Sequence, residues 1–298
     1  MRKKKVNYLN NKDILKEIHK SKMSYCYAVD DQYIGYDIIV DSVNDITDAN
    51  IEIAKINQAA RLSSSAYDAG ILRWHDELGG KGAKPKQAEF KVEPDTIKDT
   101  DIVFRVMTFE HVPSEPNRKK TPKSVADIHT KCNFPPFKHY ALIDGEWREV
   151  VRSHWMGGFE NGSFNLTHGG MTNELAKMMM KLVERYSMRG NWRGYTYVDE
   201  MRGNALVQLS QVGLQFNEDR SQNPFAYYTA TINNSFTRVL NLEKRSQNIR
   251  DDLLQDEGYM PSFNRQLDDE ASQQAARKED EEAEKQKQEL KDAGYNVI

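Results

Sequence analysis

Cysteine is nearly absent from this chain, and the little that is present builds neither a disulfide framework nor a metal site. Only Cys26 and Cys132 occur among 298 residues, and neither has a partner at metal-ligand spacing. No apolar run approaches the roughly 18 residues of a membrane span. The basic start, MRKKKVNYLNN, lacks the apolar stretch of a signal peptide. We therefore expect a protein of the reducing cytoplasm without membrane contact.

Neither sign of charge dominates the chain. It has 42 basic and 45 acidic residues and a net charge of −3, so its overall electrostatics do not indicate a nucleic-acid binder. The apolar fraction is 38% and the mean hydropathy −0.78, which predicts that part of the chain is solvated helix or loop. The C-terminal run QAARKEDEEAEKQKQELKDAGYNVI is typical of such a solvated or partly disordered helix.

Signatures of chemistry are also missing. The stretch GGKGAKPK at 79–86 is not a phosphate-binding GxxxxGK[ST] loop and is better interpreted as a linker. Four histidines and one cysteine of the middle segment fit no zinc pattern: His111, His129, His139, His154 and Cys132. No nucleophile–base pair or carboxylate cluster stands out. We therefore expect a protein that is not an enzyme and has no metal and no cofactor.

The first half of the chain predicts two helices followed by strands. Asn11 is placed to cap a short helix, and residues 46–77 carry apolar side chains near helical spacing. From 102 to 165 the pattern is that of strands, with Asp144-Gly145 offering a hairpin turn and Asn161-Gly162 standing between aromatic residues in the same manner. This segment predicts a small α+β module.

Helices return from residue 171. The first has apolar residues at i, i+3, i+4, i+7, i+8 and i+11, which indicates an amphipathic helix: Leu175, Met178, Met179, Leu182, Val183 and Tyr186. The second runs through YVDEMRGNALVQLSQVG and places five apolar residues on one face: Val198, Met201, Ala205, Leu209 and Val212. Asn223 and Pro224 form a cap and first-turn pair that begins a third helix.

The third helix separates into two faces on a 3.6-residue period. One face is apolar and predicts a core contact: Phe225, Tyr228, Thr229, Ile232, Phe236, Val239 and Leu240. The other mixes an aromatic, short hydrogen-bonding side chains and cations: Tyr227, Thr231, Asn234, Thr237, Arg238, Asn241 and Arg245. These side chains suit single-stranded or melted nucleic acid: aromatic rings stack on exposed bases, amides bind the base edges, and cations bind the phosphates. A polar solvent face that contains one tyrosine is the alternative.

The order of these three helices resembles region 2 of bacterial sigma factors. The run from LVERYSMRGNWRGYTYVDEM to NPFAYYTATINNSFTR has the same succession of elements. These are a turn with basic and aromatic residues, a helix that begins with acidic residues, a charged loop and a helix that contains aromatic residues. The late-transcription sigma factors of T-even-like bacteriophages are more similar still, through VNYLNNKD at 6–13, NWRGYTYVDEM at 191–201 and NPFAYYT at 223–229. The resemblance covers about residues 1–20 and 171–258, and the segment 22–165 between them has no assigned role.

The resemblance implies DNA contacts along the third helix. In the family this helix captures the non-template strand of an A·T-rich promoter element, and Tyr227 stands where a tyrosine stacks on a flipped adenine. Asn234, Thr237 and Arg238 stand where the family reads the duplex edge and its phosphates, and the remaining candidate residues extend this track: Thr231, Asn241, Lys244 and Arg245. Primary sigma factors have two strand-opening tryptophans where this chain has Ala230 and Thr231, so melting here would depend on deformable TA steps or on partners.

The resemblance also implies protein partners. The acidic-led helix of the family binds the coiled coil of the largest subunit of core RNA polymerase, and the matching exposed side here carries Glu200, Asn204, Gln208 and Gln211. The T-even relatives bind the replication sliding clamp through a C-terminal apolar peptide, for which Tyr295, Val297 and Ile298 are the candidates. No second helix-turn-helix region follows residue 258, so a clamp or a co-activator would be needed to strengthen promoter recognition.

These observations lead to one expectation and two alternatives. We expect a mainly α fold, in which a sigma region 2-like helical domain (1–21 and 171–258) carries an inserted α+β module (22–170) and a charged tail (259–298). It would act as a phage late-transcription sigma factor in the host cytoplasm, associated with the nucleoid. The alternatives are a virion assembly protein and a nucleic-acid-processing enzyme whose acid/base pair would come from His111, His139 and Glu149.

Overall fold

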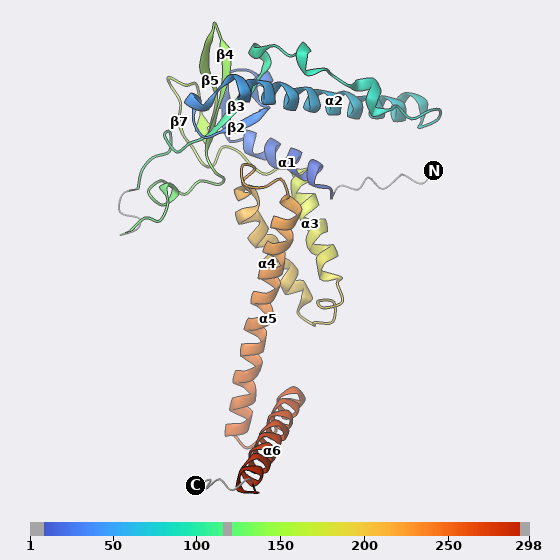
Figure 1. Cartoon of the computed structure of the whole chain (residues 1–298), viewed down its shortest axis with the longest axis vertical. Helices are drawn as coiled ribbons and strands as arrows, with labels where there is room; N and C mark the ends of the chain where they lie inside the picture. Colours follow the sequence, from blue (N-terminus) through green and yellow to red (C-terminus); the bar gives the residue numbers. More distant parts are fainter. Residues whose placement is uncertain (1–8, 116–120, 293–298) are drawn as a thin grey trace.

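The computed structural model describes residues 9–115 and 121–292, and helices dominate it (Figure 1). Six α-helices occur in this part of the chain: α1 (Asn11–Met23), α2 (Asp48–Leu78), α3 (Asn173–Ser187), α4 (Val198–Val212), α5 (Pro224–Asp256) and α6 (Phe263–Asp292). The expected helix at 46–77 is confirmed as α2, and the three helices expected after residue 171 are α3, α4 and α5. The charged tail is helical as α6.

The strands form a mixed sheet in the order β1-β5-β4-β3-β2 and a separate small pair. The sheet consists of β1 (Cys26–Ala28), β2 (Ile38–Val40), β3 (Val103–Met107), β4 (Phe137–Ile143) and β5 (Glu146–Ser153). Among the described strands, β2 and β3 pair in parallel and the other pairs are antiparallel. The pair consists of β6 (Trp155–Met156) and β7 (Ser163–Phe164). Strands in the segment 102–165 are thus confirmed, whereas β1 and β2 lie outside the strands that the sequence predicted.

One of the two expected hairpin turns is confirmed. Asp144 and Gly145 have φ values of 53° and 83° and connect β4 to β5, which is the left-handed geometry of a tight two-residue turn. Asn161-Gly162 instead belongs to a six-residue connection, 157–162, between β6 and β7. Within this connection, Trp155 Nε1 donates to the carbonyl oxygen of Gly158 (3.1 Å).

Helices cover both faces of the sheet. On one face, Ala54 of α2 packs with Phe104 and Val106 of β3. On the other face, Phe137 and Ala141 of β4 belong to one buried cluster with Ile14 and Ile18 of α1 and with the core side chains of α3, α4 and α5. Alternation along β3 turns Arg105 to this second face. The predicted boundary at residue 170 therefore passes through a continuous hydrophobic core.

Arg105 is buried on that second face, and its contacts among the described residues include no carboxylate. Its guanidinium lies 3.8 Å from the ring centroids of both Tyr36 and Phe137. Its Nε donates to Nε2 of His139 (3.0 Å) and its Nη2 to Nδ1 of His19 (3.2 Å). The second nitrogen of each imidazole donates to a backbone carbonyl, that of Tyr33 for His139 and that of Ile34 for His19. Both histidines are therefore neutral acceptors toward a buried cation.

The N-terminal helix is held by hydrogen bonds to residues far along the chain. The side chain of Asn10 accepts from the backbone N–H of Asp13 and caps α1, so the expectation that Asn11 is the cap is wrong. Asn11 lies one residue later and accepts from the backbone N–H of Phe225 (3.1 Å). Ser21 accepts from the N–H of Thr172 (3.0 Å), the residue that caps α3. α1 therefore closes the bundle of α3, α4 and α5.

A buried ion pair joins α1 to the segment that precedes α5. Lys22 Nζ lies 2.6 Å from Glu218 Oε2, with both side chains at most 9% exposed, and also donates to the carbonyl oxygen of Phe216 (2.6 Å). Burial lowers the pKa of Lys22 to about 8. Burial would raise the pKa of Glu218, but the charges of Lys22 and Arg105 outweigh it and lower that pKa. The contact fixes the connection from which α5 begins.

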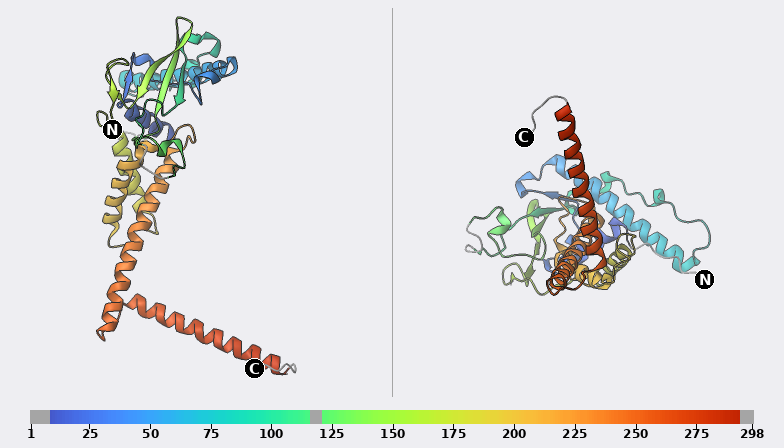
Figure 2. Two further views of the ribbon diagram at one scale, coloured as in Figure 1. Left: turned by 90° about the vertical axis from the view of Figure 1, so that its left-hand side faces the viewer. Right: turned by 90° about the horizontal axis from the view of Figure 1, so that it is seen from below.

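α5 runs away from the sheet and ends in a turn from which α6 leaves in another direction (Figures 1 and 2). Asp251 fixes this turn by accepting from the backbone N–H and the hydroxyl of Ser262 (2.9 and 2.7 Å). Exposed apolar side chains surround the turn: Ile249, Leu253, Leu254, Tyr259, Met260, Phe263 and Leu267. Within the described ranges no helix combines the length and the apolar character of a membrane span.

Candidate nucleic-acid interface

The helix that carries the candidate residues begins where the sequence predicts. Asn223 precedes α5 and its side chain accepts from the backbone N–H of Ala226 (3.0 Å), while Pro224 occupies the first helical position. Because the first four N–H groups of a helix lack partners within it, such a cap stabilises the start of α5. The start matters because it sets the rotation of every later side chain about the helix axis.

Replacing the cap Asn223 with alanine should lower the free energy of unfolding by about 1 kcal/mol, because the N–H of Ala226 loses its acceptor. Denaturant unfolding followed by circular dichroism measures this change. Gln222→Ala, one residue earlier and without a described side-chain hydrogen bond, is the matched control and should change stability by less than about 0.5 kcal/mol. Equal effects of the two substitutions would contradict the capping role.

Of the seven residues predicted for the core face of α5, four are buried and Phe225, at the start of the helix, is exposed. Tyr228, Ile232, Phe236 and Val239 are buried. Phe225 is 36% exposed, because the helix starts at the edge of the bundle. Two further members are only partly buried: Thr229, whose hydroxyl donates to the carbonyls of residues 225 and 226, and Leu240.

Tyr227 lies at the edge of the core rather than on an open face. Its hydroxyl donates to the carbonyl oxygen of Val212 (3.0 Å), and its ring meets Phe216 edge-on at 5.6 Å. Burial raises the pKa of this hydroxyl, so it remains a protonated donor. Tyr227, which the helical period placed on the non-core stripe, is therefore partly buried against the core. The same edge contains Thr231, whose hydroxyl donates to the carbonyl of Tyr227 (3.0 Å).

The distal part of the stripe lines a shallow hollow of about 460 Å³. Five of the eight candidate DNA-binding residues take part, together with Leu242, which the sequence did not single out: Asn234, Thr237, Arg238, Asn241 and Arg245. Lys244 is exposed beside them. The spacing i, i+4, i+7 and i+11 from Asn234 to Arg245 places them on one side of α5. The distal part of the polar stripe is therefore one continuous surface, and Tyr227 and Thr231 do not line it.

This surface carries three exposed cations. In the described ranges, Arg238, Lys244 and Arg245 lie beyond ion-pair distance of any carboxylate. Other exposed cations do have such partners, as Lys12 has in Asp68 and Lys91 in Glu93. Unpaired cations interleaved with amides fit a polyanion, because they can bind phosphates without first losing an internal partner.

A second polar stripe follows the outer side of α4. Glu200, Asn204 and Gln211 are exposed and Gln208 is half-buried. Gln208 donates to the side chain of Gln211 (3.2 Å), and Asn204 donates to the carbonyl of Glu200 (3.1 Å). Val207, 58% exposed, lies within this surface. The four residues proposed for a polymerase contact are thus aligned, whereas Met201, Ala205 and Leu209 are buried on the opposite side.

The residues of the enzyme alternative are engaged in structural contacts. His139 binds Arg105 and Tyr33 as described above, and Glu149 receives both Nε and Nη2 of Arg152 (2.6 and 3.1 Å). His111 contacts the hydroxyl of Ser153 (3.3 Å). No hydrogen bond among the described residues joins any two of the three. In the same ranges no three His, Cys, Asp or Glu side chains gather as a metal-binding group.

The candidate clamp-binding residues Tyr295, Val297 and Ile298 lie outside the described residues. Searches of protein families, of curated proteins and of solved structures returned no match to this chain.

Proposed function

We propose that this protein is a sigma-type promoter-specificity factor of a bacteriophage, which binds host core RNA polymerase and directs it to an A·T-rich late promoter element. The unneutralised cations and amides on one side of α5 carry the proposal. Arg238, Lys244 and Arg245 bind backbone phosphates, and the amides of Asn234 and Asn241 reach base edges. The polymerase performs the chemistry.

Two further features support the proposal that this protein binds DNA and polymerase through different surfaces. The partly exposed side chain of Tyr227 offers a stacking surface at the start of the same stripe, and a stacked base contributes roughly 1–3 kcal/mol. The polar stripe of α4 forms a different surface, built from Glu200, Asn204 and Gln211, and binds the polymerase. A clamp or co-activator adds affinity, since the chain offers one short recognition surface.

Removing the three cations of α5 tests the DNA contact. The variant Arg238→Ala/Lys244→Ala/Arg245→Ala should initiate at least ten times less transcription from a supercoiled template with a TATA-rich late promoter, given host core polymerase. Its binding to that polymerase should be unchanged. The slope of log affinity for promoter DNA against log salt should become shallower by about 2–3, because each phosphate contact releases close to one counterion.

Arg250→Ala is the matched control, since Arg250 is an exposed arginine of the same helix, about a third of a turn away from the stripe. It should retain both transcription and salt dependence. A triple variant with native promoter use, or one whose salt slope equals that of the native protein, would contradict phosphate binding by this surface.

The alternative supported by a specific observation is an assembly protein. The exposed apolar side chains at the turn between α5 and α6, including Tyr259, Met260 and Phe263, indicate a protein partner. If the native chain neither binds core polymerase nor starts transcription, the sigma proposal is overturned and this surface becomes the main functional feature.

A further inference from the structure

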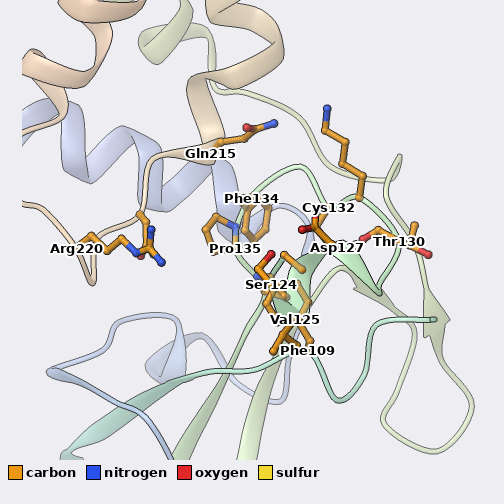
Figure 3. A pocket seen from close by; sticks show the side chains of 14 residues that line it. Phe109, Ser124, Val125, Asp127, Thr130, Cys132, Phe134, Pro135, Gln215 and Arg220 are labelled. Carbon is orange, nitrogen blue, oxygen red and sulfur yellow. Dashed lines mark hydrogen bonds between the residues drawn. The ribbon is translucent and has the colours of Figure 1, made fainter. Parts of the chain in front are cut away.

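A cavity of about 890 Å³ lies between the segment 124–136 and the connection from α4 to α5 (Figure 3). Its volume falls in the range of about 300–1,000 Å³ that is usual for ligand sites. Gln215, Asn217 and Arg220 line it from the connection, and Phe109, Thr130 and Pro135 from the module that precedes α3. The site therefore joins the segment 22–170, which has no role in the proposed function so far, to the segment that leads into α5.

The lining combines flat apolar surfaces with side-chain amides that can form further hydrogen bonds. Phe109 and Pro135 supply an aromatic ring and a proline ring. Among the described residues, the side-chain amide of Gln215 has no hydrogen-bond partner, and Asn217 uses only its Oδ1, which accepts from the N–H of Asp219 (3.0 Å). Amides that can both donate and accept next to a ring surface match the edge and face of a nucleobase.

The charge at the cavity favours an anion. Lys131 and Arg220 line it, are exposed, and have no carboxylate at ion-pair distance among the described residues. The one acidic residue of the lining, Asp127, accepts from the backbone N–H of Lys123 (3.1 Å). A base with its phosphate would thus find ring surfaces, amides and two cations within one cavity.

The cavity is adjacent to the start of the α5 surface. Phe216, between two lining residues of the connection, is buried and packs edge-on against the ring of Tyr227 at 5.6 Å. Its carbonyl accepts from Lys22, whose ion pair with Glu218 holds the connection. Phe216 therefore links the segment that lines the cavity to the tyrosine at which the α5 stripe begins.

We propose that this cavity binds one unpaired nucleotide of the DNA strand that α5 contacts. The base lies against Phe109 and Pro135, the amides of Gln215 and Asn217 contact its edge, and Lys131 and Arg220 bind its phosphate. This inference rests on the proposed function, and it makes the segment 22–170 a part of DNA binding. The occupant is a single-stranded nucleotide, since a paired base could not enter.

Cys132, which lines the cavity, reports its occupancy. In a Cys26→Ser background it is the only thiol of the chain, and the rate of its alkylation by a maleimide is measured with and without a short A·T-rich single strand. We expect the strand to slow alkylation at least fivefold. Arg220→Ala should raise the strand concentration needed for half-protection about tenfold, whereas Arg73→Ala, an exposed arginine of α2, should leave it unchanged.

Three other outcomes would overturn the inference. These are equal protection by the duplex form of the same sequence, protection by inorganic phosphate or a free mononucleotide but not by the strand, and unchanged protection in Arg220→Ala. The result is separable from the proposed function. If alkylation is not slowed while the three α5 cations are still required for transcription, the cavity assignment fails alone. If the strand protects Cys132 but the protein does not bind core polymerase, the sigma proposal fails alone.

Discussion

Replacing Glu218 with leucine is expected to lower the free energy of unfolding by about 3–5 kcal/mol, because the ammonium group of Lys22 would remain buried without its counter-charge. The carbonyl of Phe216 and the ring of Phe134, whose centroid lies 5.6 Å from Nζ, would be its remaining described partners. Urea unfolding followed by tryptophan fluorescence measures the loss. The double variant Lys22→Met/Glu218→Leu removes both charges and should recover most of it, since an apolar pair of similar volume costs no desolvation of ions.

The matched control is the exposed pair of Lys177 and Glu174, whose 2.7 Å separation is nearly the same. Glu174→Leu should leave stability nearly unchanged, because solvent screens exposed ion pairs. A Glu218→Leu variant no less stable than Glu174→Leu would contradict a stabilising role for the buried pair. A double variant as unstable as the single one would show that packing rather than charge is responsible.

Acid should unfold this protein steeply, beginning below about pH 6.5. Burial, followed by the charge of Arg105, lowers the pKa of His19 to about 3. The same two causes hold that of His139 well below its usual value. Burial also lowers the pKa of His154 to about 3 and that of His111 to about 4. In each case the unfolded chain binds a proton near pH 6.5 and the folded chain does not. The contribution of each histidine to stability is therefore fully present above that pH and is lost as pH falls toward the lowered pKa.

Each such histidine contributes a slope of up to about 1.4 kcal/mol per pH unit between its unfolded and folded pKa. Unfolding free energies measured from pH 8 to pH 4 test this. His19→Gln should reduce the slope by up to one histidine's share, since glutamine can accept from Arg105 without titrating. His75→Asn, which removes an exposed histidine, should not change it. A stability that is constant down to pH 5 would contradict the neutral, buried state of these side chains.

How far the sequence predicts the fold depends on whether local spacing or distant pairing forms each element. All six apolar residues predicted for the core face of α3 are buried, because an amphipathic period is encoded within the helix itself. β1 and β2 each have three residues and too little alternation to register as strands. They exist through partners far along the chain, as in the pairing of Ala28 with Val151 and of Ile38 with Phe104.

The same distinction applies to the candidate sites. The alignment of Asn234, Arg238 and Asn241 follows from helical spacing alone, whereas the partial burial of Tyr227 depends on Phe216 and Val212, which no periodicity places beside it. Arg105 stands within the apolar run DIVFRVMTF, and its burial depends on two histidines brought from other elements. The cavity at Gln215 and Arg220 arises where two irregular segments meet, and such segments leave no periodic signal.

Helix α1 is synthesised long before the residues that it contacts in the folded protein. This helix leaves the ribosome well before its hydrogen-bond and ion-pair partners Thr172, Glu218 and Phe225, which are translated about 150 to 215 positions later. At about 5–20 residues per second, that interval lasts roughly 10–40 s. During it the apolar side of the nascent helix, with Ile14 and Ile18, has no native partner in the helical bundle. The chain is therefore expected to need chaperone protection early in translation and to complete its core only when the start of α5 emerges.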